Sequence, residues 1–326
     1  MTTRAIRLGR LALATLGVAM MHGAPALAQD RYPSRTVEIV VPFAAGGGSD
    51  LIARVLTDRL GESLKQRFVV INRPGASTNI GTTAVANAPA DGHTLLLTSI
   101  SFTANPSLYR KLSYSQKDFA PIVLIANSPS ILVVPTASPI NSVAELVAEL
   151  KARPGALNYA SYGAGSGPHL AAGLFQDITG TAIQHVPYGG GSPATVAVLR
   201  GEVQMLLAGS LAVGAQSQSG GLKPLAIAAE TRTTAFPNVP TFREQGIDYL
   251  TGTWFGLLAP AKTPPDIIAL LNREVLAALR SDAVRARIAE QGSDVIGGSP
   301  EDFANFLKAE TERLSAVIRR ANIHLD

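Results

Sequence analysis

Residues Thr36 to Asp50 read TVEIVVPFAAGGGSD. The first part, Thr36 to Pro42, is short and rich in β-branched residues, which predicts a buried β-strand. A glycine-dense loop from Phe43 to Gly48 follows it. Ser49 or Asp50 then caps a predicted helix whose apolar residues recur with helical spacing. A strand, a glycine loop and a helix in this order are typical of α/β folds, which bind ligands at the carboxyl ends of their strands.

The same alternation of strands and helices continues along the chain. Two further short apolar runs, Phe68–Ile71 and Thr94–Thr98, predict strands, and a helix is predicted between them at about 77–88. This order predicts a parallel sheet with helices on both faces. Separate strands are predicted at Ile122–Ala126 and Ile131–Val134, and three amphipathic helices end the chain. We therefore expect an α/β protein.

Length and composition exclude several classes of protein. A chain of 326 residues is long enough for about two ordinary domains. Its 46% hydrophobic and 16% charged residues exclude a disordered chain. It contains no cysteine, which excludes disulfides, thiolate metal sites, a cysteine nucleophile and a lipid-modified cysteine.

The first 28 residues have the three parts of a secretory signal peptide. Three arginines among the first ten residues form a basic start, Leu11 to Met21 is apolar or small, and Ala26-Leu27-Ala28 provides a cleavage site before Gln29. Removal of these three arginines lowers the formal net charge from +4 to +1. A nearly neutral chain has no general attraction to nucleic acid. Because no later stretch is apolar over the roughly 18 residues of a membrane span, we expect a soluble periplasmic protein.

Three glycine-rich loops share one design. They are Phe43–Asp50, Ser161–Gly167 and Tyr188–Ser192, and each follows a predicted strand and precedes a predicted helix. Glycine lets the backbone approach a ligand closely. The start of a helix presents unpaired N–H groups and the positive end of its dipole. The three loops therefore predict a site that binds an anion without a charged side chain.

The composition of the loops favours a carboxylate over a nucleotide. The chain has no Gly-Lys dipeptide, so it has no Walker P-loop, and none of the loops completes the G-x-G-x-x-G pattern. Asp50 is the only charged residue in the three loops. Phosphate groups usually also recruit lysine or arginine. Neutral backbone donors suit a carboxylate better.

Patterns that indicate catalysis or metal binding are weak. No G-x-S-x-G elbow and no H-x-x-x-H pattern occurs, so we expect no metal and no cofactor. His169 opens a predicted helix close to Ser166, which leaves an exported serine hydrolase with a Ser166–His169 pair as the alternative function. In the other interpretation His169 forms the pocket wall or caps its helix. Asp50 in the first turn of its helix is mostly typical of a cap rather than a general base.

Several long segments resemble a known family. They include VPFAAGGGSDLIARVL from Val41, NRPGASTNIGTTAVANAPADGHTLLLTS from Asn72, LNYASYGAGSGPHLAAGLF from Leu157 and HVPYGGGSPA from His185. The mature chain resembles, over its whole length and in order, the tripartite tricarboxylate receptor family. These proteins are the Bug-type (TctC-like) periplasmic solute-binding receptors.

The resemblance implies a fold and a function. The fold is a two-lobed α/β flytrap in which each lobe has a mainly parallel sheet flanked by helices. Lobe one is expected at residues 29–125 and 251–326, and lobe two at 126–250. The function is capture of a small organic carboxylate between the lobes and its delivery to membrane transporter subunits or a sensor protein. We expect a monomer, no enzymatic activity and no nucleic-acid partner.

The resemblance also implies which loops hold the ligand. One carboxylate is expected to bind backbone amides of two loops, one in each lobe, and these are two of the loops found above from their glycines. Ser99 follows the third strand and adds a polar contact, and Tyr188 comes from the third loop. The residues expected to bind the ligand are Phe43, Ala45, Gly46, Gly47, Gly48, Ser49, Asp50, Ser99, Ser161, Gly163, Gly165, Ser166, His169 and Tyr188.

The chain departs from the family pattern at the distal end of the ligand. Small residues stand at Gly189–Gly191 and Leu206–Ser210, where many relatives carry longer polar side chains. This departure favours a roomier distal pocket and a bulkier or aromatic monocarboxylate rather than citrate. The aromatic residues that are candidates for lining the pocket are Phe43, Phe102, Tyr162, Tyr188, Trp254 and Phe255.

Overall fold

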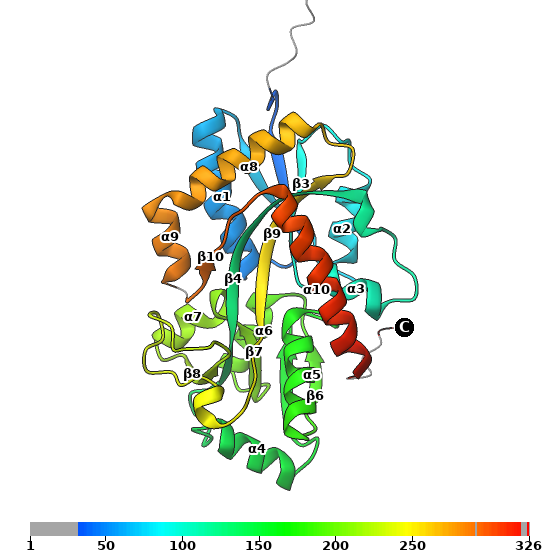
Figure 1. The fold of residues 1–326 in the computed structure, drawn as a ribbon. Coiled ribbons are helices and arrows are strands. Elements are labelled where there is room, and N and C mark those ends of the chain that lie inside the picture. The colour runs from blue at the N-terminus through cyan, green and yellow to red at the C-terminus, as the bar shows by residue number, and fades with distance from the viewer. Residues whose placement is uncertain (1–31, 291, 321–324, 326) are drawn as a thin grey trace, which may run out of the picture. The chain divides into compact units, whose positions relative to one another are not determined.

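The computed structural model of the chain describes residues 32–290, 292–320 and 325. The predicted signal peptide lies outside these described residues. The predicted strand–loop–helix unit is present (Figure 1). Strand β1 pairs in parallel with both β2 and β3, which confirms the predicted parallel arrangement. The elements are β1 (Val37–Val41), α1 (Gly48–Leu64), β2 (Phe68–Asn72), α2 (Asn79–Ala86) and β3 (Thr94–Ser99).

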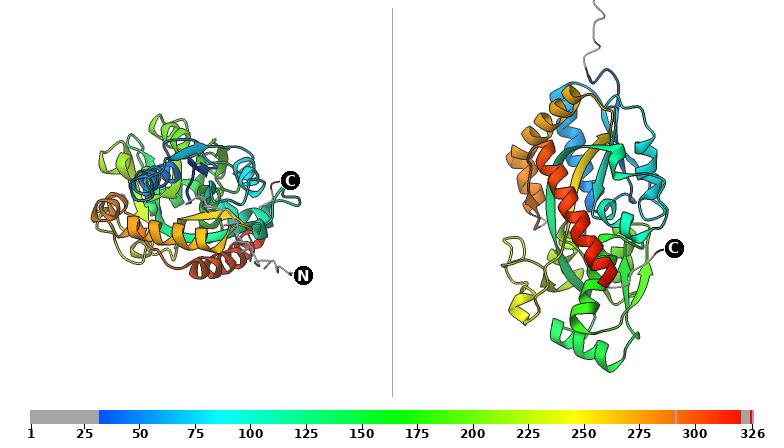
Figure 2. Two further views of the ribbon diagram at one scale, coloured as in Figure 1. Left: turned by 90° about the horizontal axis from the view of Figure 1, so that it is seen from above. Right: turned by 45° about the vertical axis from the view of Figure 1, so that its right-hand side comes forward.

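The sheet of the first lobe is completed by strands from later parts of the chain. Strand β9 lies between β3 and β4 and is antiparallel to both, and β10 pairs with β4. One face of this sheet packs against α1, α8 and α9, and the other against α2, α3 and α10 (Figure 2). The elements are α3 (Ser101–Leu108), β4 (Phe119–Pro135), β9 (Gly252–Pro260), α8 (Pro265–Arg280), α9 (Asp282–Ala289), β10 (Asp294–Val295) and α10 (Pro300–Arg320).

The second lobe has its own sheet. Strand β5 pairs in parallel with β6 and β7, while β7 and β8 are antiparallel to β4. Each lobe therefore contains a parallel βαβ part and an antiparallel part, and the α/β class and the two-lobed architecture are confirmed. The elements are α4 (Val143–Ala152), β5 (Asn158–Ser161), α5 (Gly167–Thr179), β6 (Gln184–Pro187), α6 (Gly191–Leu199), β7 (Met205–Gly209), α7 (Ser210–Gln218) and β8 (Leu222–Ile227).

Strand β4 runs through both lobes (Figure 1). The prediction of two separate strands here was wrong. The strand pairs with β9 as far as Pro129 and with β7 and β8 from Ser130 onward. The backbone N–H of Ser130 donates to the carbonyl of Thr251 at 2.9 Å, and the two side-chain oxygens lie 3.0 Å apart. These hydrogen bonds keep β4 paired directly after Pro129, which has no N–H to donate.

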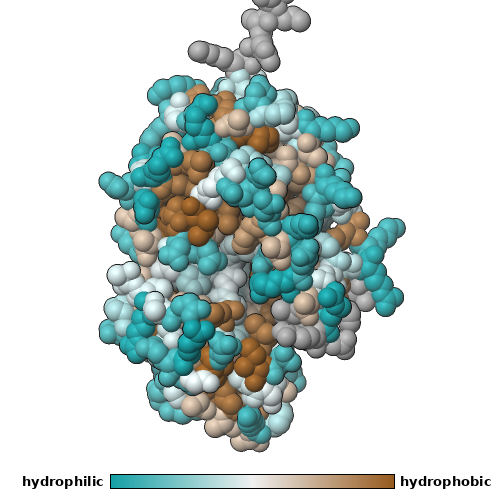
Figure 3. All heavy atoms as spheres, viewed as in Figure 1, coloured by the Kyte–Doolittle hydropathy of each residue, from teal (hydrophilic) through white to brown (hydrophobic). Residues whose placement is uncertain are grey.

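Two helices in the structure were not predicted. Helix α3 contains Pro106, and α7 reads SLAVGAQSQ, which has no clear apolar stripe. Both helices begin directly after a strand, and burial of their first residues stabilises them more than their intrinsic propensity does. None of the helices among the described residues is long and apolar enough to cross a membrane. The face drawn in Figure 3 is mostly hydrophilic, with smaller hydrophobic areas between the charged residues.

Candidate functional site

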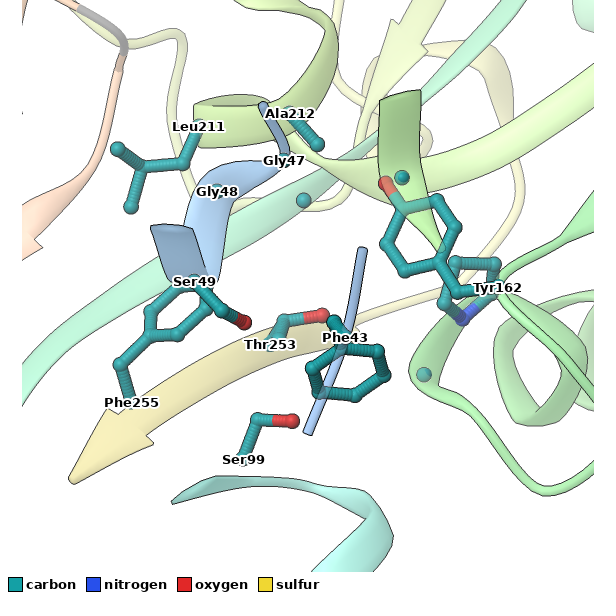
Figure 4. A pocket seen from close by; sticks show the side chains of 14 residues that line it. Phe43, Gly47, Gly48, Ser49, Ser99, Tyr162, Leu211, Ala212, Thr253 and Phe255 are labelled. Carbon is teal, nitrogen blue, oxygen red and sulfur yellow. The ribbon is translucent and has the colours of Figure 1, made fainter. Parts of the chain in front are cut away.

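A small cavity of about 20 Å³ lies where the two lobes meet (Figure 4). This volume is about that of one water molecule. Both sheets contribute walls, because the lining comes from the ends of β1, β3 and β9 in one lobe and from the loops around β5, β6 and β7 in the other. The lining residues are Phe43, Gly47, Gly48, Ser49, Ser99, Tyr162, Gly167, Pro168, Gly191, Gly209, Leu211, Ala212, Thr253 and Phe255.

Four helix N-termini converge on this cavity. Helices α1, α5, α6 and α7 begin at Gly48, Gly167, Gly191 and Ser210, and residues of each first turn line the cavity. None of the four N-cap residues caps its helix with a side chain. Among the described residues, the lining contains no aspartate, glutamate, lysine or arginine. At α7 the Leu211 N–H already donates to the Ser128 hydroxyl at 3.0 Å. The positive ends of the four helix dipoles still point toward the cavity, which is an arrangement that favours an anion.

Asp50 braces the first glycine loop from behind. Its carboxylate accepts hydrogen bonds from the Gly46 N–H at 3.0 Å, from the Arg54 guanidinium at 2.8 Å and from the Asn72 amide at 3.1 Å. Burial alone would raise the pKa of Asp50, but these hydrogen bonds hold it below its usual value. The same Asn72 amide also donates to the carbonyl of Phe43. The Asp50 carboxylate thus forms its hydrogen bonds with groups of the protein itself and does not line the cavity.

The second glycine loop is held by its own hydroxyl groups. The Ser161 hydroxyl lies 2.6 Å from Nε2 of His185 and accepts the Gly163 N–H at 3.1 Å. The Ser166 hydroxyl donates to the Gly163 carbonyl at 2.6 Å. Nδ1 of His169 accepts the Gly165 N–H at 2.9 Å. Ser166 and His169 each bond to the loop backbone rather than to one another, so the alternative Ser166–His169 catalytic pair is not formed.

The two histidines behind this loop are neutral. Burial, together with the smaller effect of the neighbouring His185, lowers the pKa of His169 to about 4. Burial also lowers the pKa of His185. A neutral imidazole is required at position 169, because only an unprotonated Nδ1 can accept the Gly165 N–H. The lowered pKa of His169 is therefore consistent with the hydrogen bond that its Nδ1 accepts from Gly165.

Five of the predicted ligand-binding residues line the cavity, namely Phe43, Gly47, Gly48, Ser49 and Ser99. The others form or support the loops without lining it. These are Ala45, Gly46, Asp50, Ser161, Gly163, Gly165, Ser166, His169 and Tyr188.

The sequence did not indicate the part of the wall formed by Leu211, Ala212 and Thr253. Gly209 belongs to the segment Leu206–Ser210, which was predicted to face the distal end of the ligand. Leu211 and Ala212 follow this segment in the first turn of α7.

The candidate aromatic residues divide into two groups. Phe43, Tyr162 and Phe255 line the cavity. Phe102 instead packs against Tyr114 and Phe119, and Trp254 packs against Phe303 and Phe306. Tyr188 does not line the cavity. Strand alternation explains the difference between Trp254 and Phe255, because neighbouring residues of β9 face opposite sides of the sheet.

The first and third glycine loops touch each other across the lobes. The Ala44 N–H donates to the Gly189 carbonyl at 3.4 Å. A Cβ atom at Gly190 would lie 2.9 Å from the Ala44 nitrogen, and one at Gly191 would lie 3.4 Å from the ring of Tyr162. The small residues in this loop let the lobes approach closely. The roomier distal pocket expected from these residues stays a prediction.

The described residues contain no group of three or more histidine, aspartate or glutamate side chains arranged to hold a metal ion. In the described part of the chain, the polar side chains that line the cavity are those of Ser49, Ser99, Tyr162 and Thr253, all of which carry hydroxyl groups. The site thus offers neutral donors and aromatic walls.

Known proteins are similar to this chain over most of its length. A family model described as "Tripartite tricarboxylate transporter family receptor" matches residues 52–323. Protein BugT of Bordetella pertussis is 39% identical over 327 residues, which cover 99% of both chains.

Two solved structures are also similar to the chain. "R. palustris Rpa4515 with adipate" is 36% identical with a TM-score of 0.87, over 90% of this chain and 100% of that chain. "MatC (Rpa3494) from Rhodopseudomonas palustris with bound malate" is 32% identical with a TM-score of 0.84, over 88% and 100%. Both descriptions name a dicarboxylate as the bound molecule.

Proposed function

The chain belongs to the tripartite tricarboxylate transporter receptor family, and on this premise we propose that it captures a small organic carboxylate between its lobes and delivers it to a membrane transporter. The observation that carries the proposal is the convergence of four helix N-termini on one cavity without charged side chains. Helix N-termini stabilise an anion by their dipoles and their unpaired N–H groups. Exclusion of water between the lobes strengthens these interactions.

The lining narrows the class of ligand. The hydroxyl and backbone donors satisfy a carboxylate, while Phe43 and Phe255 offer apolar contacts to its carbon chain. A tricarboxylate such as citrate would need several cationic partners, which the lining does not supply. The similar proteins with bound adipate and malate support an acid with one or two carboxylates.

Binding requires the lobes to separate and close again. Sites for small molecules occupy about 300–1,000 Å³, far more than the closed cavity provides. We propose that the lobes are residues 29–125 with 251–326, and residues 126–250. The start of β9 at Gly252 supports the second boundary. Strand β4 changes partners at Ser130, which supports a first boundary a few residues after the proposed one. The two strands that connect the lobes there form the hinge.

We place the mature protein in the periplasm after removal of residues 1–28, as a monomer that meets transporter subunits or a sensor protein. The basic start, apolar stretch and Ala-x-Ala site of the first 28 residues support export. The family description supports a transporter partner.

Thermal unfolding against paired compounds tests the proposal. Purified residues 29–326 are heated with succinate, malate, adipate, citrate and benzoate, and with the methyl ester or amide of each. An acid at 100 times its Kd adds about 2.7 kcal/mol of stability, and its ester should add none. Refolding from denaturant first removes any acid retained during purification. If no acid then raises the midpoint, or if the esters raise it equally, the carboxylate receptor is excluded.

A further inference from the structure

The hydroxyl of Tyr162 stands out among the polar groups of the cavity. Tyr162 is the first residue after β5, and its side chain enters the cavity from the second lobe (Figure 4). Its ring packs against the buried cluster that contains Phe43 and Phe255 and also against the core of the second lobe. The ring is thus fixed between the lobes in the closed conformation.

The Tyr162 hydroxyl oxygen is buried and has no hydrogen-bond partner among the described residues. Two other tyrosine hydroxyls, one buried and one partly buried, are paired. The Tyr249 hydroxyl donates to the Ala171 carbonyl at 2.7 Å, and the Tyr32 hydroxyl donates to the Gly92 carbonyl at 2.7 Å. Buried polar groups almost always find a partner. An unpaired hydroxyl in the wall of a binding cavity therefore indicates a partner on the ligand.

The environment makes this hydroxyl a hydrogen-bond donor. Burial raises the pKa of Tyr162 well above its ordinary value, so the phenol keeps its proton. No carbonyl or carboxylate of the described chain accepts that proton. The neighbouring N-termini of α1 and α6 supply only further donors. All groups on this side of the cavity can donate, and a carboxylate satisfies them best, because its two oxygens accept several charge-assisted hydrogen bonds.

We propose that the Tyr162 hydroxyl donates a hydrogen bond to a carboxylate oxygen of the bound acid and is a specificity-determining residue of the receptor. This inference rests on the proposed function and adds the side chain through which the second lobe recognises the acid. Because the ring contacts both lobes, the bond forms only after closure. A hydrogen bond to a charged acceptor is stronger than one between neutral groups, so the hydroxyl favours the acid over its neutral ester.

The substitution Tyr162→Phe tests this role, because it removes the hydroxyl and keeps the ring. Tyr249→Phe is the matched control, since its hydroxyl is bonded to the backbone away from the cavity. Both variants and the parent protein are titrated calorimetrically with succinate, malate, adipate and benzoate, and each is unfolded thermally without acid. We expect Tyr162→Phe to weaken binding by about 10- to 100-fold without lowering the unfolding midpoint. Tyr249→Phe should lower the midpoint and leave affinity unchanged.

The outcomes separate this inference from the proposed function. If the parent binds an acid and Tyr162→Phe binds it within twofold, the hydroxyl has no role and the receptor function stands. If Tyr162→Phe loses affinity together with its unfolding midpoint, as the control loses its midpoint, the loss is structural and the inference is wrong. If the parent binds none of the four acids, the proposed function fails in this form and the inference fails with it.

Discussion

The imidazole rings of His169 and His185 stack face to face, with centroids 4.2 Å apart and planes 5° from parallel. The ring of Tyr159 stacks on His185 with centroids 5.0 Å apart. Each histidine holds one part of the loop Ser161–Gly167, since His169 accepts the Gly165 N–H and His185 bonds to the Ser161 hydroxyl. The shape of the second glycine loop thus depends on two neutral imidazoles in contact.

Stability should therefore fall at acidic pH. The pKa of His169 is about 4 in the folded protein and 6.5 without the fold. Between these values only the unfolded chain binds the proton, so unfolding becomes easier as the pH drops from 6.5 towards 4. Because a pKa difference of one corresponds to about 1.4 kcal/mol, the loss at pH 4 is on the order of 2–3 kcal/mol. Urea unfolding across this range measures it. His169→Gln should flatten the dependence, and an unchanged slope would rule out this histidine as its cause.

Asp50 should contribute more to stability than its partner Arg54. Its side chain is 5% exposed, whereas that of Arg54 is 58% exposed. Asp50→Ala leaves the Gly46 N–H without an acceptor and removes one of the two acceptors of the Asn72 amide, so we expect a loss of about 2–4 kcal/mol and weaker acid binding. Arg54→Ala removes a mostly exposed ion pair and should cost less than about 1 kcal/mol. Chemical denaturation of both variants gives the comparison. Equal losses would contradict the role of Asp50 as the brace of the loop.

A bulky side chain at Gly191 should hold the lobes apart. A Cβ atom there would already touch Gly47 and Tyr162 at 3.4 Å, so the methyl groups of Gly191→Val have no space in the closed conformation. We expect at least a tenfold loss of affinity for acids and a larger radius of gyration by small-angle X-ray scattering. The control is Gly189→Val, because a Cβ atom there would meet no atom within 4 Å. If both variants bind equally well, contact between the loops is not needed for closure.

Trp254 should report the motion of the lobes. It is the only tryptophan of the chain. Its neighbours Thr253 and Phe255 line the cavity, while the indole packs in a cluster that includes Leu170 of the second lobe. Separation of the lobes would expose part of this cluster, so an acid that closes them should change the fluorescence of the indole. A titration followed by fluorescence should give the same affinity as calorimetry. A saturating acid without any spectral change would show that this cluster stays intact when the lobes open.

The glycine loops were the most predictable part of the site. A buried strand, three glycines and a polar residue predict that a helix begins near Ser49, because each feature is local. The predicted cap at Ser49 or Asp50 was wrong, since the N-cap is Gly47 and the helix begins at Gly48. Thr253 and Phe255 were not predictable as partners of these residues, since β9 reaches the cavity from a distant part of the chain. The role of Asp50 needed the structure as well. An aspartate that caps a helix and one that supports a loop have the same sequence pattern. The hydrogen bond between Asp50 and Asn72 distinguishes the two roles.

The position of β9 has a consequence for the order in which the protein folds. This strand lies between β3, which ends at Ser99, and β4, yet it begins only at Gly252. A chain that leaves the ribosome from its N-terminus therefore completes the strands of the second lobe before the centre of the first lobe exists. Contacts so distant in sequence form slowly. The nascent chain thus lacks a finished first lobe for most of its synthesis, and its apolar strands depend on protection from aggregation until residue 260 has emerged.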